Sequence, residues 1–380
     1  MKVKQVVLTA LNITPESILQ LQDIQPQLIL VFASMAHFNA NFFSNTLLNS
    51  MPHAQWLGCS TAGEISASGV TDNTAIFTAI HFEHPDFKIA IAPLINMKQT
   101  AIAGQTLGKA LNHIDLKNIL VFGQGVDING SALIDGIKAI VNDKVIISGG
   151  LAGDAGRFTR TFTLSNDGIS DQSIVAIGFY GEHIQLSVGY FGGWQAFGSA
   201  RQVSRYDNNI LYELDGKPAL DLYKNYLGDY AKELPASGLL FPFSMMTPER
   251  KTMGIIRTLL GINESEGSLT LAGDVIENGY LQLMLASTEA LVSGAETAAN
   301  LIKNEKELDT TGLAILISGV GRKLLMGGRV DEEVEAVGEV FGAELLLAGF
   351  YANGEIGPYL NTSDSKLHNQ TMTITYLSEK

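Results

Sequence analysis

The 380-residue sequence predicts an α/β (α+β) fold, with two pseudo-equivalent domains built from repeated αβ units with mixed sheets. One pattern recurs three times: an apolar strand, a helix-length stretch, and a glycine-containing turn that ends in an acid. The three strands begin at Ile29, Ile119 and Ile315, and the three acids are Glu64, Asp154 and Glu355. Between the first two copies, strand and acid shift by the same 90 residues (119 − 29 and 154 − 64). A repeated unit of this kind indicates a scaffold that builds a site between its copies.

The first copy is predicted from runs of apolar residues and from alternation. Its expected elements are a buried strand, an amphipathic helix and three further strands: Ile29–Ala33, Asn41–Asn49, Trp56–Cys59, Ala75–Phe82 and Phe87–Ala92. The second copy follows the same order, with the strand Ile119–Phe122, a helix over Ser131–Val141, the strand Val145–Ile147, and a β-ribbon through 162–164, 173–180 and 185–190.

A glycine-rich and aromatic stretch, 191–198, marks the expected change of domain, so the predicted domains are 1–195 and 196–380. The second domain opens with a strand over Arg201–Tyr206 and a helix over Ala219–Tyr226. Residues 238–290 resemble a decayed copy of the repeat, with a strand at 239–241, a turn at 269–274 and a return strand at 280–285. A helix over Val292–Lys303 and a last strand over Thr371–Leu377 complete the prediction, which gives each domain two units.

Composition excludes several classes of function. The formal net charge of −14, with no basic patch, argues against nucleic acid and anionic membranes as partners. The single cysteine, Cys59, excludes an intramolecular disulfide and a thiolate metal cluster. Neither a signal peptide nor an apolar run of about 20 residues is found, so we expect a cytoplasmic protein.

Polar residues follow the predicted strands, where α/β sheets form their binding crevices. They are His37, Gln124, Asp127 and Arg322 after the strands, and Glu64, Asp154 and Glu355 in the turns. If the copies face one another, these side chains converge on a pocket of mixed charge. The alternative is that the acids only cap strands and are solvated.

Cys59 is the one thiol available to a hydrolase-type enzyme, but the other copies have Gly149 and Gly349 at the position that we align with it. We therefore expect Cys59 to be a small buried residue and the protein to be no enzyme. His368 opens the final strand at the place where the earlier copies have Asp72 and Asp171, and His183 lies in a predicted hairpin.

Four segments in this order resemble the FIST sensory family, named for F-box and intracellular signal transduction proteins. They are Gly58–Glu64, Gly149–Asp154, Tyr212–Ala219 and Gly354–Pro358. The resemblance implies a FIST N-terminal sensory domain over 1–195 and a FIST C-terminal domain over 196–380. It also implies an intracellular small-ligand sensor that regulates a histidine kinase or a diguanylate cyclase/phosphodiesterase. Because no output domain follows Lys380, we expect the partner on a separate chain, and a homodimer stays open.

The favoured ligand under this resemblance is haem with nitric oxide as signal, as in NosP-type FIST proteins. It implies His368 as the axial ligand, with His183 and His37 as further candidates, and Trp194 and Phe197 as pocket walls. Arg322 matches the family's small-residue-then-arginine loop and would bind a carboxylate. The alternative ligand is an amino acid or another small metabolite, which Arg322 would clamp together with Glu355 or Asp154.

Overall fold

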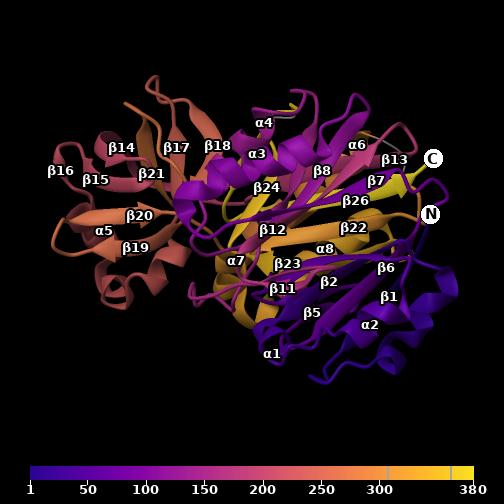
Figure 1. The fold of residues 1–380 in the computed structure, drawn as a ribbon. Helices are drawn as coiled ribbons and strands as arrows, with labels where there is room; N and C mark the ends of the chain where they lie inside the picture. The colour runs from indigo at the N-terminus through magenta and orange to yellow at the C-terminus, as the bar shows by residue number, and fades with distance from the viewer. Residues whose placement is uncertain (306–307, 360–361) are drawn as a thin grey trace.

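The computed structural model describes residues 1–305, 308–359 and 362–380 of the chain. Three units of one αβ plan close around a common core, and an antiparallel insert stands beside them (Figure 1). Each unit has an outer strand, a helical segment, a central strand, further helices, a parallel strand, a hairpin and a final strand. The mixed α/β architecture of repeated units is therefore confirmed.

The first unit follows this plan with short helices. Its elements are β1 (Lys2–Leu8), η1 (Pro15–Ile24), β2 (Leu28–Ser34), α1 (Met35–Asn39), α2 (Asn45–Ser50), β3 (Gln55–Thr61), β4 (Glu64–Ser66), β5 (Gly69–Thr71) and β6 (Ala75–His81). The single helix predicted over Asn41–Asn49 is wrong, since two short helices flank Asn41, whose φ is 51°. A residue in the left-handed backbone conformation cannot continue a right-handed α-helix.

The second unit has the longest helices of the first two. Its elements are β7 (Phe87–Pro93), η2 (Met97–Gln99), α3 (Thr100–Leu111), β8 (Leu116–Gly123), α4 (Gly130–Lys138), β9 (Ile146–Leu151), β10 (Thr163–Ser165), β11 (Gly168–Ser170) and β12 (Ser173–Tyr180). Glycines at 104, 108 and 136 let α3 and α4 pack closely, because a Cβ on Gly136 would lie 2.3 Å from the Ala101 carbonyl oxygen.

The third unit is split by the insert. Its elements are β13 (Ile184–Phe191), α6 (Thr288–Glu305), β22 (Leu313–Gly319), α7 (Val320–Met326), η5 (Gly327–Arg329), α8 (Asp331–Phe341), β23 (Leu346–Ala352), β24 (Gly354–Pro358), β25 (Ser365–His368) and β26 (Met372–Glu379). In every unit the central strand pairs in parallel with the strand that follows it and antiparallel with the last strand: β2 with β3 and β6, β8 with β9 and β12, β22 with β23 and β26.

Each unit gives its hairpin to a neighbour's sheet. The β4–β5 hairpin pairs with β23 of the third unit, β10 with β3 of the first, and β24 with β9 of the second. The exchange is cyclic, so the three sheets are completed only when all three units are present. The strand orders that result are β1-β6-β2-β3-β10-β11, β25-β24-β9-β8-β12-β7 and β13-β26-β22-β23-β4-β5.

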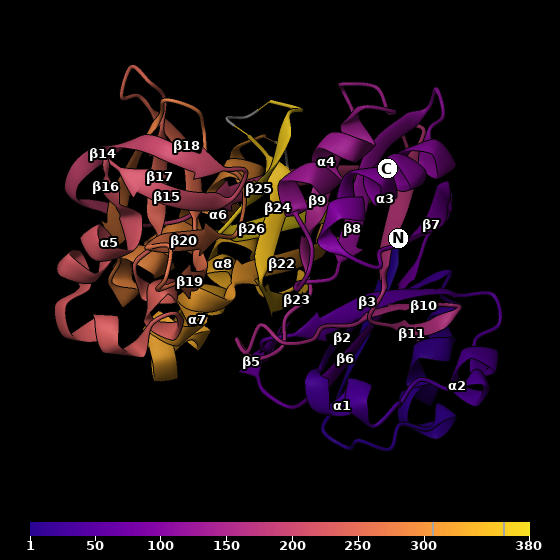
Figure 2. The same ribbon diagram turned by 60° about the vertical axis from the view of Figure 1, so that its left-hand side comes forward.

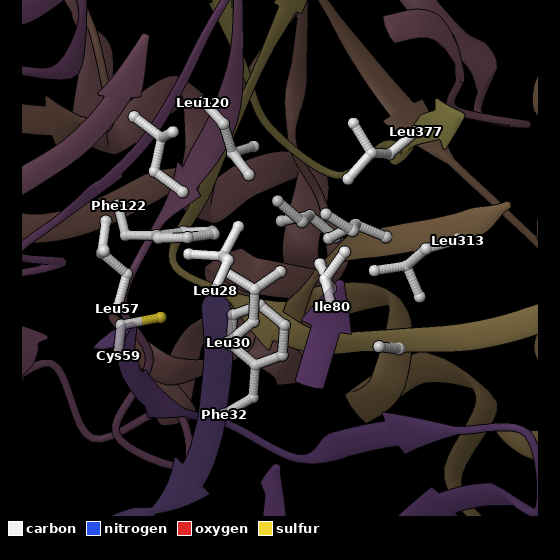
Figure 3. Packing of buried hydrophobic residues seen from close by; sticks show 14 of the residues in the cluster. Leu28, Leu30, Phe32, Leu57, Cys59, Ile80, Leu120, Phe122, Leu313 and Leu377 are labelled. Carbon is white, nitrogen blue, oxygen red and sulfur yellow. The ribbon is translucent and has the colours of Figure 1, made fainter. Parts of the chain in front are cut away.

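The core that joins the units lies where the inner faces of the three sheets meet. Phe32, Phe122 and Phe350 come from different units, and their ring centroids lie 4.8–6.1 Å apart. Leucines and isoleucines surround them (Figure 3). The continuous apolar runs of β2, β8 and β22 are explained by this burial on both faces.

Residues 195–285 form the insert, a lobe of antiparallel strands on the left of Figure 1. Its elements are β14 (Gln195–Asp207), β15 (Ile210–Leu214), β16 (Lys217–Pro218), α5 (Ala219–Leu227), η3 (Gly228–Glu233), η4 (Ala236–Leu240), β17 (Phe243–Met246), β18 (Thr252–Arg257), β19 (Leu259–Asn263), β20 (Ser268–Leu271) and β21 (Tyr280–Leu285). Gln195 pairs with Leu285, so the insert leaves and re-enters the third unit at one point (Figure 2).

The fourth copy expected over 238–290 is wrong. Its strand at 239–241 falls on η4, and β17, β18 and β21 pair only antiparallel, so residues 238–290 contain no β-α-β unit. The molecule therefore contains three αβ units in all, and not two units in each of two domains. Strand pairing also crosses residue 195, since β13 pairs with β26 and β9 with β24.

Candidate ligand site between the three units

The turns after β3, β9 and β23 meet at the centre of the molecule. Three backbone hydrogen bonds join them in a closed ring, from the Ala62 amide to the Tyr351 carbonyl (2.8 Å), from Asn353 to Leu151 (3.1 Å) and from Gly153 to Ser60 (2.8 Å). Each unit donates one bond and accepts one. The ring fixes the three turns relative to one another.

Strand register shows which residues are equivalent in the turns. Glu64 lies opposite Thr71, Thr163 opposite Ser170, and Glu355 opposite His368. The alignment of Asp154 with the two glutamates is therefore wrong, because Thr163 holds that position after eight extra residues, 155–162. The alignment of His368 with Asp72 and Asp171 is also wrong, because the hairpin pairs His368 where Thr71 and Ser170 stand.

The Oε2 atoms of the two equivalent glutamates accept the same pair of hydrogen bonds from a threonine, and Glu64 Oε1 also accepts one from Thr61. Glu64 Oε2 accepts hydrogen bonds from the Thr74 amide (2.9 Å) and hydroxyl (2.8 Å), and Glu355 Oε2 accepts them from Thr371 at the same two distances. Burial raises the pKa of Glu64, and raises that of Glu355 to about 8, while these hydrogen bonds act in the opposite direction.

A cavity of about 700 Å³ lies beside the ring and takes its walls from all three units. The first unit contributes the end of β2, α1, the turn with Glu64, and Asp72 and Asn73. The second contributes the loop with Asp154 and Arg157, and the third contributes α7 with Lys323. Two predicted ligand residues, Glu64 and Asp154, thus share one cavity.

Lys323 is the central cation of this cavity. Its amine donates to the Ala62 carbonyl oxygen (2.9 Å), pairs with the Asp72 carboxylate, and lies 5.6 Å from the centre of the Tyr351 ring. The amine packs against Gly63 (φ 144°), where a Cβ would approach it to 2.4 Å. The Lys323 side chain is 16% exposed and Asp72 is 64% exposed, so the pair lies at the cavity mouth.

Arg157 provides a second cation, on the part of the cavity wall that the second unit forms. It is exposed and forms no ion pair within the described part of the chain. Asp154 holds its loop, because the carboxylate accepts hydrogen bonds from the amides of Phe158 (2.9 Å), Thr159 (2.7 Å) and Arg160 (3.2 Å). Asp154 thus stabilises its own loop, and its carboxylate oxygens already accept hydrogen bonds from that loop.

Arg322 does not reach this cavity. It is fully buried and paired with the equally buried Glu333 at 2.7 Å, and it donates to the carbonyls of Gly192, Gln370 and Leu291. A guanidinium with these partners has no donor to offer an incoming carboxylate. Arg322 therefore joins α7 to α8 and to the segment 192–194.

The other loop residues lie apart from the main cavity. His37 is buried with Nδ1 2.9 Å from Ser34 Oγ and Nε2 3.2 Å from the Ala10 carbonyl oxygen. Gln124 and Asp127 line a separate cavity of about 210 Å³ at the turn of the second unit. The seven polar residues therefore do not converge on one pocket.

Neither candidate haem ligand faces a described cavity. His368 is fully buried, its Nε2 lies 3.1–3.2 Å from two carbonyl oxygens, and its ring stacks on Tyr190 at 4.3 Å. Burial lowers the pKa of His368 to about 4. His183 is exposed and stacks on His84 at 4.0 Å.

Trp194 lines an apolar cavity of about 490 Å³ between the third unit and the insert, and its indole N–H donates to the Gln370 carbonyl (2.8 Å). Phe197 lies further along β14, is 42% exposed and contacts Tyr226. Of the two aromatic residues expected in a pocket wall, Trp194 lines this cavity and Phe197 does not.

Cys59 is fully buried, and burial raises the pKa of its thiol well above the usual value. Its alignment with Gly149 and Gly349 is wrong, because the register pairs Phe32 with Cys59, Phe122 with Gly150 and Ile317 with Phe350. Since Phe350 occupies the equivalent position, no small residue is required there.

Two protein-family models match this chain. The model of the FIST N domain matches residues 27–217, and that of the FIST C domain matches residues 219–358. The chain belongs to the FIST family. FIST domains are sensory domains of signal transduction proteins, so the coarse assignment from the sequence is confirmed.

Two curated relatives resemble this chain at nearly the same sequence identity. The uncharacterized protein MJ1623 of Methanocaldococcus jannaschii is 24% identical over 51% of this chain and 39% of its own length. The uncharacterized protein Rv0628c of Mycobacterium tuberculosis is 25% identical over 63% of this chain and 60% of its own. The chain thus matches well under two thirds of either relative.

Among solved structures, the crystal structure of a cyanuric acid hydrolase from A. caulinodans aligns with 100% of this FIST chain and 99% of its own, at a TM-score of 0.37 and 7% identity. None of the helices in the described part of the FIST chain is long and apolar enough to cross a membrane.

Sequence reasoning missed Lys323, Arg157 and Asp72. Lys323 follows Arg322 directly, and on a helix the two point to different faces, so the motif drew attention to the buried member of the pair. Arg157 lies among the eight extra residues 155–162, which the equal 90-residue spacing led us to overlook. These extra residues in the second copy could have drawn attention to Arg157.

Proposed function

We propose that this FIST protein is a non-catalytic sensor whose small ligand binds in the cavity between the three units. The observation that carries the proposal is the convergence of all three units on one cavity of about 700 Å³, with cations from two of the units in its lining. A ligand there touches the turn of the first unit, the loop of the second and α7 of the third, so its binding alters how the units pack.

The side chains favour a small anionic or zwitterionic metabolite, such as an amino acid. A ligand carboxylate would bind Arg157 and Lys323, and an ammonium or hydroxyl group would face Asp72. Binding to Lys323 competes with the Lys323–Asp72 pair, which joins α7 to the segment after the β4–β5 hairpin. The ligand therefore acts directly on a contact between units.

The surroundings of Cys59 support a role without catalysis, because a buried thiol with a raised pKa is a poor nucleophile. The signalling partner in this proposal is a histidine kinase or a diguanylate cyclase/phosphodiesterase on a separate chain.

The residues present do not fit haem. An axial histidine needs a free nitrogen directed into an apolar slot. Nε2 of His368 is engaged by two carbonyls. Its Nδ1 has no hydrogen-bond partner in the described part of the chain, but the ring is fully buried and stacks on Tyr190. The apolar cavity at Trp194 has no histidine in its wall. An absorption spectrum of protein from haem-supplemented cells tests this directly, and we expect no Soret band. A Soret band at one haem per chain that His368→Ala removes would overturn this assignment.

A thermal-shift screen of amino acids and small carboxylates tests the proposed function. We expect at least one compound to raise the melting temperature of the wild type, and both Lys323→Met and Arg157→Gln to lose that response. Arg205→Gln, an exposed arginine of the insert, is the matched control and keeps it. A response unchanged in both cavity variants would show that the ligand binds elsewhere.

A further inference from the structure

A further, small cavity lies at the turn of the third unit. Its walls are Gly319 and Val320, the turn residues Asn353 and Glu355, and the hairpin residues Asn369 and Gln370. The insert covers the cavity like a roof, with the residues Leu239, Thr258 and Leu260. The volume open to the centre of a water-sized sphere is about 10 Å³, which is room for one particle of that size.

Unpartnered oxygens gather around this cavity. Within the described part of the chain, the oxygens without a hydrogen-bond partner include Thr258 Oγ1, Asn353 Oδ1, Asn369 Oδ1 and Gln370 Oε1. Thr258, Asn369 and Gln370 are only 2–4% exposed. Buried polar atoms are rarely left unpaired, so four in one place indicate a bound species.

The orientation of two of the amides is fixed by their nitrogens. Gln370 Nε2 donates to the Leu239 carbonyl oxygen (3.1 Å), and Asn353 Nδ2 donates to the Gly125 carbonyl oxygen (3.2 Å). Exchanging oxygen and nitrogen would break both hydrogen bonds. The cavity wall therefore presents oxygens that can only accept a hydrogen bond or bind a cation.

Glu355 adds a carboxyl group to this wall, which becomes a negatively charged ligand when it gives up its proton. Its Oε2 is held by Thr371, and its Oε1 lies toward Gly319, where a Cβ would be 3.0 Å away. The nearest buried arginines have carboxylates of their own: Arg322 pairs with Glu333, and Arg257 lies in the field of Asp274. Among the described residues, Glu355 therefore has no cation within ion-pair distance, although Arg322 favours its charged form.

One water molecule would not satisfy this group, since it donates two hydrogen bonds while the wall presents at least three acceptors. A dehydrated cation binds several oxygens at once. With one carboxylate in the wall, a monovalent cation leaves the cavity neutral, whereas a divalent ion would leave a buried excess of charge. Mg²⁺ also needs room for the waters that it retains.

We propose that this cavity binds one dehydrated alkali-metal cation, sodium or potassium, through Glu355, Asn353, Asn369, Gln370 and Thr258. The ion joins the third unit to the roof that the insert provides. This inference is independent of the ligand in the cavity between the units.

Thermal unfolding in 150 mM sodium or potassium chloride, compared with choline chloride at equal ionic strength, tests the ion. We expect a melting temperature several degrees higher with one of the alkali cations, and Glu355→Gln to lose most of that difference. Glu64→Gln is the matched control, because Glu64 Oε2 accepts the same pair of hydrogen bonds from a threonine, while its Oε1 is engaged by Thr61. We expect this variant to keep the cation response. Equal melting temperatures in choline and in both alkali salts would overturn the proposal.

Crystals soaked in thallium(I) or rubidium give a second test that needs no variant to fold. An anomalous peak among the five side chains would support the site, and an ordered water there without anomalous signal would rule it out.

Discussion

Glu355 shows how burial makes a single carboxyl control stability. Its pKa of about 8 stands above the ordinary 4.5, chiefly through burial, with Glu333 acting in the same direction and Thr371 and Arg322 against it. Between pH 4.5 and 8 the folded state holds a proton that the unfolded state has released. The stability that this proton contributes is therefore full below pH 4.5 and is lost as the pH rises to about 8.

Replacing Glu355 by glutamine should remove this pH dependence. In buffer with choline as the only cation, we expect Glu355→Gln to gain roughly 2–5 kcal/mol over the wild type between pH 4.5 and 8, with no further gain above. Urea unfolding at pH 5, 7 and 9 measures it, with exposed Glu335→Gln as control. A difference that does not change with pH would contradict the buried, protonated carboxyl.

The buried pair of Arg322 and Glu333 should matter for folding rather than for ligand binding. We expect Arg322→Met to lower the free energy of unfolding by about 3–5 kcal/mol, because Glu333 is left charged and buried. Arg329→Met is the control, since its pairs with Glu289 and Glu332 are exposed, and it should cost under about 1 kcal/mol. Equal losses in urea unfolding would refute the distinction.

At the scale of elements, the parallel strand of each unit depends on one glycine. A Cβ on Gly58, Gly149 or Gly349 would lie 1.8–1.9 Å from a carbonyl oxygen of the neighbouring central strand. We expect Gly349→Ala to abolish cooperative unfolding, as followed by circular dichroism, while Gly328→Ala, with nothing within 4 Å, leaves it intact. A stable, cooperatively folded Gly349→Ala protein would show that the close pairing is not required.

These elements also show what the sequence could reveal. The sequence located β12 at Ser173–Tyr180, and the helix expected over Ala219–Tyr226 with Pro218 at its first turn is α5, because both signals are local in the chain. The hairpin exchange could not be predicted, since β4 and β5 are three residues each and their partner β23 lies almost 300 residues away. The equal 90-residue spacing of Glu64 and Asp154 was misleading, because an extension of eight residues separates Asp154 from the equivalent Thr163.

For the whole molecule, the cyclic exchange makes each unit depend on the others. Residues 1–195 alone lack β26, β23 and β24, the partners of β13, β4 and β9. We expect this fragment to be unfolded or aggregated by size exclusion and circular dichroism, and to be rescued by co-expression with 196–380. Cooperative unfolding of the isolated fragment would instead support two independent domains.

The central claim is that the ligand sits where the three units meet. The most direct measurement is a crystal structure of the protein with the compound that gives the largest thermal shift. We predict density for the compound between Arg157 and Lys323, with the Lys323–Asp72 pair broken. Density in the apolar cavity beside Trp194, with the Lys323–Asp72 pair intact, would contradict it.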